Sequence, residues 1–160
     1  MHDTKKPSDV MRAWFQRVWC ERDEAAIDEL LAPDGEVYGL GPETVIGPAA
    51  FKTFWRAMNA TFAAVDLAVV DAIDNGERTY VLCRGTLTHG DRALPFEGGC
   101  LCDVRDGVIV RAWNYWDFVS LMAAMGSVPV DAFARACAGE RFAADAGRDA
   151  ERRASARRSP

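Results

Sequence analysis

The sequence has very little histidine and no long hydrophobic run. His2 and His89 are the only histidines among 160 residues, so chemistry that needs several imidazole bases or ligands is excluded. No apolar run approaches the roughly 20 residues that a membrane-spanning helix needs, and residues 1–8 are polar without a hydrophobic signal region. We therefore expect a cytoplasmic protein without a membrane partner, whose chemistry relies on carboxylate, phenol and amide groups.

The cysteines match neither a disulfide framework nor a zinc site. Their number is odd, and without an export signal we expect reduced thiols: Cys20, Cys83, Cys100, Cys102 and Cys137. The Cys-Leu-Cys run at 100–102 lacks the two-residue spacer and the second pair that a structural zinc site uses. We expect no metal ion.

Positive charge is not clustered in the body of the chain. The net charge is −5, but residues 141–160 hold six arginines against three acidic residues, a net of +3, which leaves −8 for residues 1–140. An acidic body excludes a nucleic-acid platform. We expect one domain over residues 1–128, followed over 129–160 by a helix and an Arg/Ala-rich disordered tail. A weaker hypothesis is that this tail docks an acidic partner.

The first third of the chain has helical periodicity. Ser8 is a candidate N-cap for a helix with an apolar stripe at Val10, Met11, Trp14, Phe15, Val18 and Trp19. Asp23 can cap a second helix, which Pro33-Asp34-Gly35 ends. Short strands follow over 36–40 and 44–46. A helix from Pro48 has Phe51, Phe54, Trp55 and Met58 on one face.

The middle of the chain has β periodicity. Strands over 63–73 and 79–89 meet at Asn75-Gly76, and strands over 96–104 and 108–116 meet at Asp106-Gly107. Helices over 118–125 and 130–139 follow. Helices first and antiparallel strands afterwards predict an α+β fold, in which a curved antiparallel or mixed sheet wraps the N-terminal helices like a cone. Such a cone leaves a cavity for a small ligand.

Alternation along the last two strands predicts which side chains face that cavity. With a three-residue loop and a bulge, the expected pairs are Val104–Val108, Cys102–Val110, Cys100–Ala112, Gly98–Asn114 and Phe96–Trp116. This face is small and apolar except for Asn114, so it belongs inside, as does Cys83 on the strand over 79–89. The opposite face is aromatic and charged, with Arg84, Thr86, Asp103, Arg111, Trp113 and Tyr115, and predicts a homodimer interface.

Several segments together resemble the nuclear transport factor 2-like superfamily, in particular its SnoaL-like polyketide cyclase branch. They are residues 32–38, 46–51, 106–109, 113–117 and 121–126, so that the resemblance spans about Val10 to Gly126. It implies the cone-shaped α+β barrel predicted above. It leaves the function open among cyclases, isomerases, dehydratases, epoxide hydrolases and non-catalytic binders.

The resemblance assigns candidate roles position by position. The water-activating aspartate of limonene-epoxide-hydrolase-like members matches Asn114, and their tyrosine matches Tyr38, but their arginine and second aspartate match Cys83 and Gly85. The acid/base aspartate of SnoaL-like cyclases matches Asp117, which is equally suited to capping the next helix. The epoxide-hydrolase mechanism therefore lacks its base in this chain.

Two functional hypotheses follow. The first is a cofactor-independent acid/base isomerase, cyclase or hydratase/hydrolase for an apolar, carbonyl-bearing, polyketide- or terpenoid-like substrate. Tyr38 and Asn114 would polarise its oxygen, and Asp117 or Asp34 would move the proton. The expected substrate-binding residues, each of which also suits ordinary core packing, are Trp14, Phe54, Trp55, Met58, Cys83, Gly98, Cys100 and Trp116. The alternative is a non-catalytic homodimeric module that binds a hydrophobic ligand.

Overall fold

Four helical segments at the start of the chain provide one layer of the fold. The computed structural model describes residues 5–142. The helical segments before residue 64 are α1 (Pro7–Ala13), the π-helix η1 (Trp14–Cys20), α2 (Ala25–Leu30) and α3 (Gly47–Thr61), and the first two strands of the sheet lie between α2 and α3. The N-cap of α2 is Glu24, one residue after the predicted Asp23, but Asp23 Oδ1 accepts from the N–H groups of Ala25 and Ala26 at 3.1 and 3.3 Å and so binds the first turn as expected.

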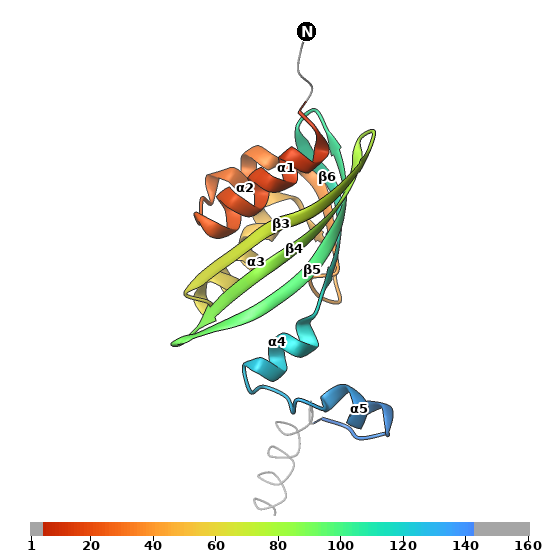
Figure 1. The fold of residues 1–160 in the computed structure, drawn as a ribbon. Coiled ribbons are helices and arrows are strands. Elements are labelled where there is room, and N and C mark those ends of the chain that lie inside the picture. Colours follow the sequence, from red (N-terminus) through yellow and green to blue (C-terminus); the bar gives the residue numbers. More distant parts are fainter. Residues whose placement is uncertain (1–4, 143–160) are drawn as a thin grey trace, which may run out of the picture.

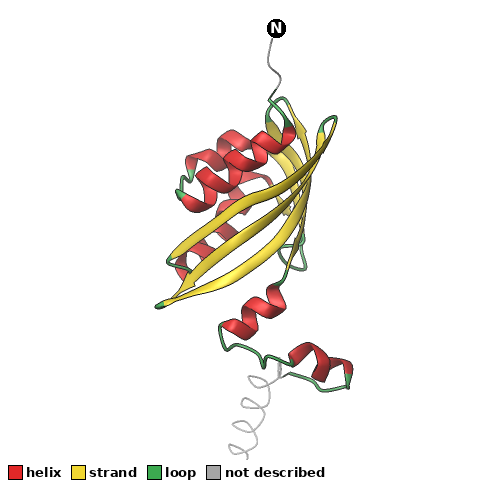
Figure 2. Cartoon of the chain, viewed as in Figure 1, coloured by secondary structure: helices red, strands yellow, loops and turns green. Residues whose placement is uncertain are grey.

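A six-stranded, curved and open sheet forms the second layer. Its strands are β1 (Leu31–Tyr38), β2 (Val45–Ile46), β3 (Ala64–Asn75), β4 (Arg78–His89), β5 (Arg92–Arg105) and β6 (Val108–Trp116). Their order is β2-β1-β6-β5-β4-β3, and every neighbouring pair is antiparallel except β1 and β6. Helices α1, α2 and α3 lie against the concave side of this sheet (Figures 1 and 2). The α+β fold predicted from the sequence is confirmed.

The hairpin between β5 and β6 differs from the predicted register. Asp106 and Gly107 have φ values of 50° and 79°, so they form a two-residue turn in which Arg105 pairs with Val108. A bulge after Asp103 then shifts the pairing, and Cys100 lies opposite Asn114 instead of Ala112. Cys102 likewise pairs with Ala112, and Gly98 with Trp116. From Ala112 onward the error is two residues, an even number, so these side chains keep the predicted face. Before the bulge the prediction is wrong, because Val104 pairs with Ile109 and it is Ile109, not Val108 or Val110, that lines the cavity.

The beginnings of α1 and β1 also differ from the prediction. Lys6, not Ser8, is the N-cap of α1, because Pro7 takes the first helical position. The Ser8 hydroxyl instead donates to Asp74 at 2.6 Å and ties the helix to β3. Strand β1 begins at Leu31, directly after α2, and its pairing with β6 is irregular between Leu31 and Glu36. This irregular stretch accommodates Pro33, which cannot donate to a ladder.

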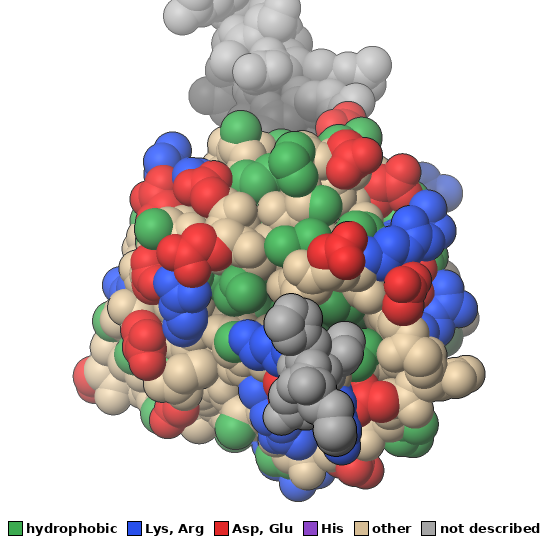
Figure 3. Space-filling model, turned by 90° about the horizontal axis from the view of Figure 1, so that it is seen from above, with side chains coloured by type: hydrophobic (Ala, Val, Ile, Leu, Met, Phe, Trp, Pro, Cys, Tyr) green, Lys and Arg blue, Asp and Glu red, His purple; other side chains and the backbone are tan. Residues whose placement is uncertain are grey.

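The chain continues beyond the sheet as two short helices, α4 (Phe118–Ala124) and α5 (Ala132–Cys137). Both lie past the end of the sheet (Figure 1). Val130 and Phe133 are 92% and 72% exposed there. The predicted disordered tail lies mostly outside the described residues. On the face seen in Figure 3, basic and acidic side chains are interspersed. Among the described residues, no helix is long and apolar enough to cross a membrane.

Candidate functional site

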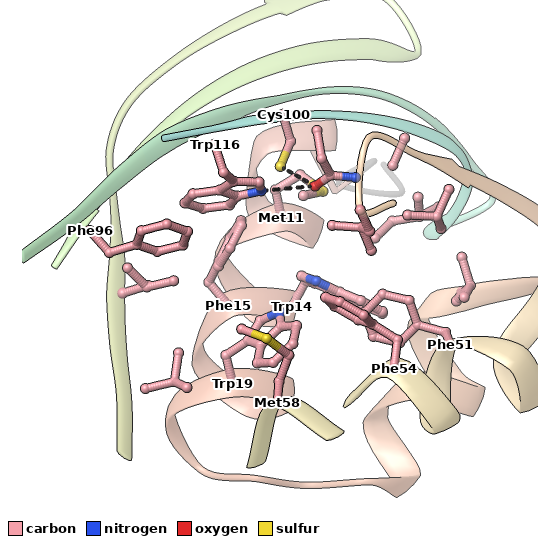
Figure 4. Close-up of a pocket in the computed structure, with 18 of the residues that line it drawn as sticks. Met11, Trp14, Phe15, Trp19, Phe51, Phe54, Met58, Phe96, Cys100 and Trp116 are labelled. Atoms are coloured by element: carbon pink, nitrogen blue, oxygen red, sulfur yellow. Dashed lines mark hydrogen bonds between the residues drawn. The ribbon is translucent and has the colours of Figure 1, made fainter. Parts of the chain in front are cut away.

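An apolar cavity lies between the helices and the concave side of the sheet. Its walls combine side chains from α1, η1 and α3 with the inward face of β1, β3, β4, β5 and β6, and Figure 4 shows ten of them labelled. The lining residues are Met11, Trp14, Phe15, Trp19, Leu31, Val37, Leu40, Phe51, Phe54, Met58, Val65, Leu67, Leu87, Phe96, Cys100, Ile109, Ala112, Asn114, Trp116 and Phe118. None of these is Asp, Glu, His, Lys or Arg.

The cavity is narrow because aromatic rings fill most of the cone. Phe96 and Trp116 stack at 4.9 Å between centroids, and Trp14 meets Phe51 edge to face at 5.0 Å. About 50 Å³ is open to the centre of a water molecule, which is space for a few waters. The half-buried lining residues, which form the mouth, are Leu40, Phe54, Met58, Asn114, Trp116 and Phe118. A larger ligand must displace some of them.

Asn114 is the principal polar group of the cavity wall. Its Oδ1 accepts from the thiol of Cys100 at 3.0 Å and from the indole Nε1 of Trp116 at 3.3 Å. Its Nδ2 donates to the carbonyl oxygen of Tyr38 at 2.9 Å. An amide has two acceptor positions and two N–H groups, so three of the four are engaged within the protein. The remaining N–H of Nδ2 has no acceptor among the described residues, and it can serve a ligand.

The thiols near Asn114 are unreactive core groups. Cys83, Cys100 and Cys102 are all buried on the inward face, as predicted, although only Cys100 lines the cavity. Burial raises the pKa of Cys83 to about 12. The neighbouring thiol of Cys102 and burial together raise the pKa of Cys100 well above its ordinary value. Cys100 is therefore a protonated S–H donor at neutral pH and not a nucleophile.

Tyr38 does not reach the cavity that it was expected to share with Asn114. Val37 is 4% exposed and lines the cavity, so alternation along β1 turns Tyr38 to the outer face. There its ring stacks on Trp113 at 5.6 Å, and its hydroxyl donates to Glu36 at 2.6 Å. This hydrogen bond raises the pKa of Tyr38 and lowers that of Glu36. Glu36 also accepts from Arg111 at 3.1 Å, which completes a polar cluster outside the sheet.

The two candidate carboxylates also lie away from the cavity. Asp117 is exposed and caps α4, since its Oδ1 accepts from the N–H of Ser120 at 3.0 Å. The hydrogen bonds from Ser120 lower the pKa of Asp117, so the residue is ionised at neutral pH. Asp34 is exposed in the irregular part of β1. Among the described residues no carboxylate lines the cavity, and no cluster of three His, Cys, Asp or Glu side chains is arranged to hold a metal ion.

The expected substrate-binding residues divide into two groups. Trp14, Phe54, Met58, Cys100 and Trp116 line the cavity. The other three, Trp55, Cys83 and Gly98, do not and support it from behind.

Each of these supporting residues has a structural task. The indole of Trp55 donates to the carbonyl of Val18 at 2.8 Å and joins α3 to η1. Cys83 packs in the fully buried core. Gly98 lies directly beneath the ring of Trp116, where a Cβ would come within 2.4 Å of Trp116 Cε3.

Trp19 is the most informative lining residue that the sequence did not single out as a site residue. Residues five apart are separated by about 140° around an α-helix, which separates Trp14 from Trp19. The π-helix η1 has i to i+5 hydrogen bonds, such as that from Glu21 N to Gln16 O at 2.9 Å. Its wider turn brings residues five apart onto nearly the same face of the helix. Both tryptophans consequently line the cavity. The apolar stripe contained Trp19, but it gave no sign of the π geometry.

The chain is thus an α+β protein in which a curved, open sheet encloses an apolar cavity against its helices. The chain belongs to the SnoaL-like domain family, whose sequence profile matches residues 11–112. The resemblance found from the sequence is thereby confirmed. This family includes polyketide cyclases and isomerase-like proteins. A comparison with curated proteins gave no significant match.

Solved structures support the same relationship. A loop-truncation variant of IdmH, a Streptomyces antibioticus protein assigned as a polyketide cyclase, is 27% identical over 76% of this chain and 100% of its own, with a TM-score of 0.66. A protein from Jannaschia sp. CCS1, assigned as a SnoaL-like polyketide cyclase, shares the fold at 15% identity and TM-score 0.67, over 81% and 99% of the two chains. An LEH-like epoxide hydrolase of M. tuberculosis shares it at 17% identity and 0.61, over 76% and 96%.

Proposed function

We propose that this protein binds an apolar, carbonyl-bearing small molecule in the cavity and acts on it without a cofactor, as an isomerase or cyclase of the SnoaL-like type. The observation that carries the proposal is the single amide, Asn114, in an otherwise apolar wall. Trp116 and Cys100 donate hydrogen bonds to its Oδ1, which fixes the orientation of the amide and therefore the position of Nδ2 and its free N–H. A fixed donor in an apolar cavity polarises a carbonyl more strongly than bulk water does. The substrate class is polyketide- or terpenoid-like.

A second candidate is a binding protein without catalysis. Its support is the absence of a carboxylate or histidine from the cavity lining in the described part of the chain. Under this hypothesis Asn114 orients a ligand and nothing moves a proton. Under the first, a water molecule in the cavity takes the proton from the carbon next to the carbonyl, Asn114 stabilises the enolate oxygen, and the carbon then receives a proton from water.

Acetophenone in D₂O separates the two candidates. Calorimetry measures binding, and NMR follows deuterium incorporation at the methyl group, which requires enolisation. The catalytic proposal expects saturable binding and exchange above the protein-free rate, both reduced in Asn114→Leu. Asn59→Leu is the matched control, since Asn59 lies on α3 outside the cavity lining. Binding without added exchange would establish the second candidate, and no binding would overturn both.

We also propose that the outer sheet face is a homodimer interface. Ile73 and Tyr115 are 67% and 63% exposed there, and Tyr80 is 38% exposed. Apolar and aromatic side chains exposed together on one face are typical of an interface. Sedimentation analysis should give a dimer that Tyr115→Arg shifts toward monomer. A wild-type protein that sediments as a monomer at high micromolar concentration would overturn this proposal.

A further inference from the structure

Two hydrogen-bond donors on the helical side of the cavity have no partner. Trp14 and Trp19 are 6% and 8% exposed, and both line the cavity. An indole N–H is a donor only and usually finds an acceptor when it is buried. Trp55 Nε1 donates to Val18 and Trp116 Nε1 donates to Asn114, but no acceptor is found for Trp14 or Trp19 within residues 5–142.

These two donors are not sealed inside the packed core. In the described chain, the one unpartnered side-chain nitrogen or oxygen without accessible surface is Asn59 Oδ1. Each unpaired indole nitrogen therefore retains some accessible surface, although its side chain is more than nine-tenths buried. We infer that this surface faces the cavity, because both side chains line it.

The tryptophans lie across the cavity from Asn114. Figure 4 shows Trp14 and Trp19 on the side opposite Trp116 and Cys100, the two residues that donate to Asn114. The cavity thus has an indole donor pair on one side and an amide N–H on the other. A ligand that spans it can offer one acceptor to each side.

The side chains of the wall offer donors but no strong free acceptor. Both acceptor positions of Asn114 Oδ1 are already used, by Cys100 and Trp116. The free polar hydrogens belong to Trp14, Trp19 and Asn114 Nδ2. A ligand hydroxyl or amine would therefore leave its own hydrogen without an acceptor, whereas a ketone or ester oxygen would be satisfied.

We propose that the cavity selects ligands that carry hydrogen-bond acceptors and no donors, and that Trp14 and Trp19 form a second acceptor-binding subsite. This inference rests on the proposed function, since it specifies the substrate class of the same cavity. Ketones, quinones and esters fit this class, and the corresponding alcohols, phenols and amines do not. An unsatisfied buried donor weakens binding by roughly 5- to 100-fold.

Three probes of similar shape test the selectivity: ethylbenzene, acetophenone and 1-phenylethanol, with dissociation constants measured by calorimetry. The expected order of affinity is acetophenone first, with 1-phenylethanol about 5- to 100-fold weaker. If none of the three binds, the proposed function fails. If ethylbenzene and acetophenone bind but the alcohol binds as tightly as the ketone, the cavity stands and the selectivity is wrong.

Tryptophan variants test the subsite. Trp14→Phe and Trp19→Phe keep an aromatic ring and remove the N–H, so each should lower the preference for 1,4-diacetylbenzene, which carries two acceptors, over 1,4-diethylbenzene. Trp113→Phe is the matched control, because Trp113 lies on the outer face, stacked on Tyr38. If a variant does not fold, indole N–H resonances of the wild-type protein give the same information. Those of Trp14 and Trp19 should move downfield with 1,4-diacetylbenzene, whose two carbonyl oxygens can serve both sides of the cavity, and not with 1,4-diethylbenzene. Unchanged resonances at saturation would overturn the subsite.

Discussion

Gly98→Ala should remodel the cavity through one methyl group. The Cβ of an alanine at this position would lie 2.4 Å from Trp116 Cε3 and 2.6 Å from the carbonyl oxygen of Tyr115. The carbonyl belongs to the paired strand β6 and has little freedom, so the indole of Trp116 must move. Its stacking on Phe96 and its hydrogen bond to Asn114 would then be lost or distorted.

The expected loss follows from three effects. Overpacking a core site costs about 1–3 kcal/mol, and a lost buried hydrogen bond adds about 1 kcal/mol. Replacing glycine with alanine also stabilises the folded state by about 0.4–1 kcal/mol, because alanine lowers the conformational entropy of the unfolded chain. The net destabilisation is about 1–3.6 kcal/mol, which corresponds to a melting temperature lower by roughly 2–14 °C for a domain of this size.

Urea unfolding of Gly98→Ala and Gly99→Ala checks this reasoning. Gly99 is the matched control, because its added Cβ would meet the hydroxyl end of Tyr80 at 2.4 Å, and that side chain is 38% exposed and can swing away. Gly99→Ala should lose less than half as much stability. The reasoning is wrong if Gly98→Ala is as stable as the wild type, or if its Trp116 indole resonance is unchanged.

Three further changes test other contacts. Asn114→Leu should cost about 2–3 kcal/mol in urea unfolding, because buried donors lose their acceptor, and a loss below 0.5 kcal/mol, well under the roughly 1 kcal/mol of one hydrogen bond, would contradict the network. Trp55→Phe should cost about 1–2 kcal/mol, since the carbonyl of Val18 loses its donor, and an unchanged midpoint would contradict it. The Arg78 guanidinium beside Asp103 holds the pKa of that carboxyl below its ordinary value. The stability advantage of the wild type over Asp103→Asn should therefore be full above about pH 5 and disappear as the pH falls through the folded pKa, and a pH-independent difference would refute it.

The inward face of the sheet was predictable because it depends only on parity. The sequence places Cys100 opposite Ala112, whereas in the structure it lies opposite Asn114, two residues further on, and both side chains line the concave face as predicted. Strand period decides the face, whereas register depends on the type of turn and on the bulge after Asp103. A bulge has no clear sequence signal here, since the flanking residues suit either register.

The positions of the polar candidates relative to the cavity were harder to predict, because side-chain chemistry does not determine the face of a strand on which a residue lies. Tyr38 was chosen for its phenol and for its resemblance to epoxide-hydrolase-like proteins, but buried Val37 beside it fixes the opposite face. The capping alternative for Asp117 was visible from its position before a helix, and the structure shows that contact. Trp19 needed knowledge of the π-helix, which hydrophobic spacing at α-helical period does not reveal.

The two faces of the sheet differ in charge near the cavity: the outer face has ion pairs around Trp113, and the inner face contributes neutral side chains to the cavity wall. Outside the sheet, Glu36, Asp103, Arg78 and Arg111 form these ion pairs. Inside, the described cavity wall has neutral donors only, because a carboxylate or ammonium placed there would lose hydration without gaining a partner. The scarcity of histidine is thus part of a wider pattern, in which none of the described residues that line the ligand space is Asp, Glu, His, Lys or Arg. Any reaction in the cavity must therefore depend on polarisation by fixed N–H groups and on the shape that the aromatic wall imposes on its ligand.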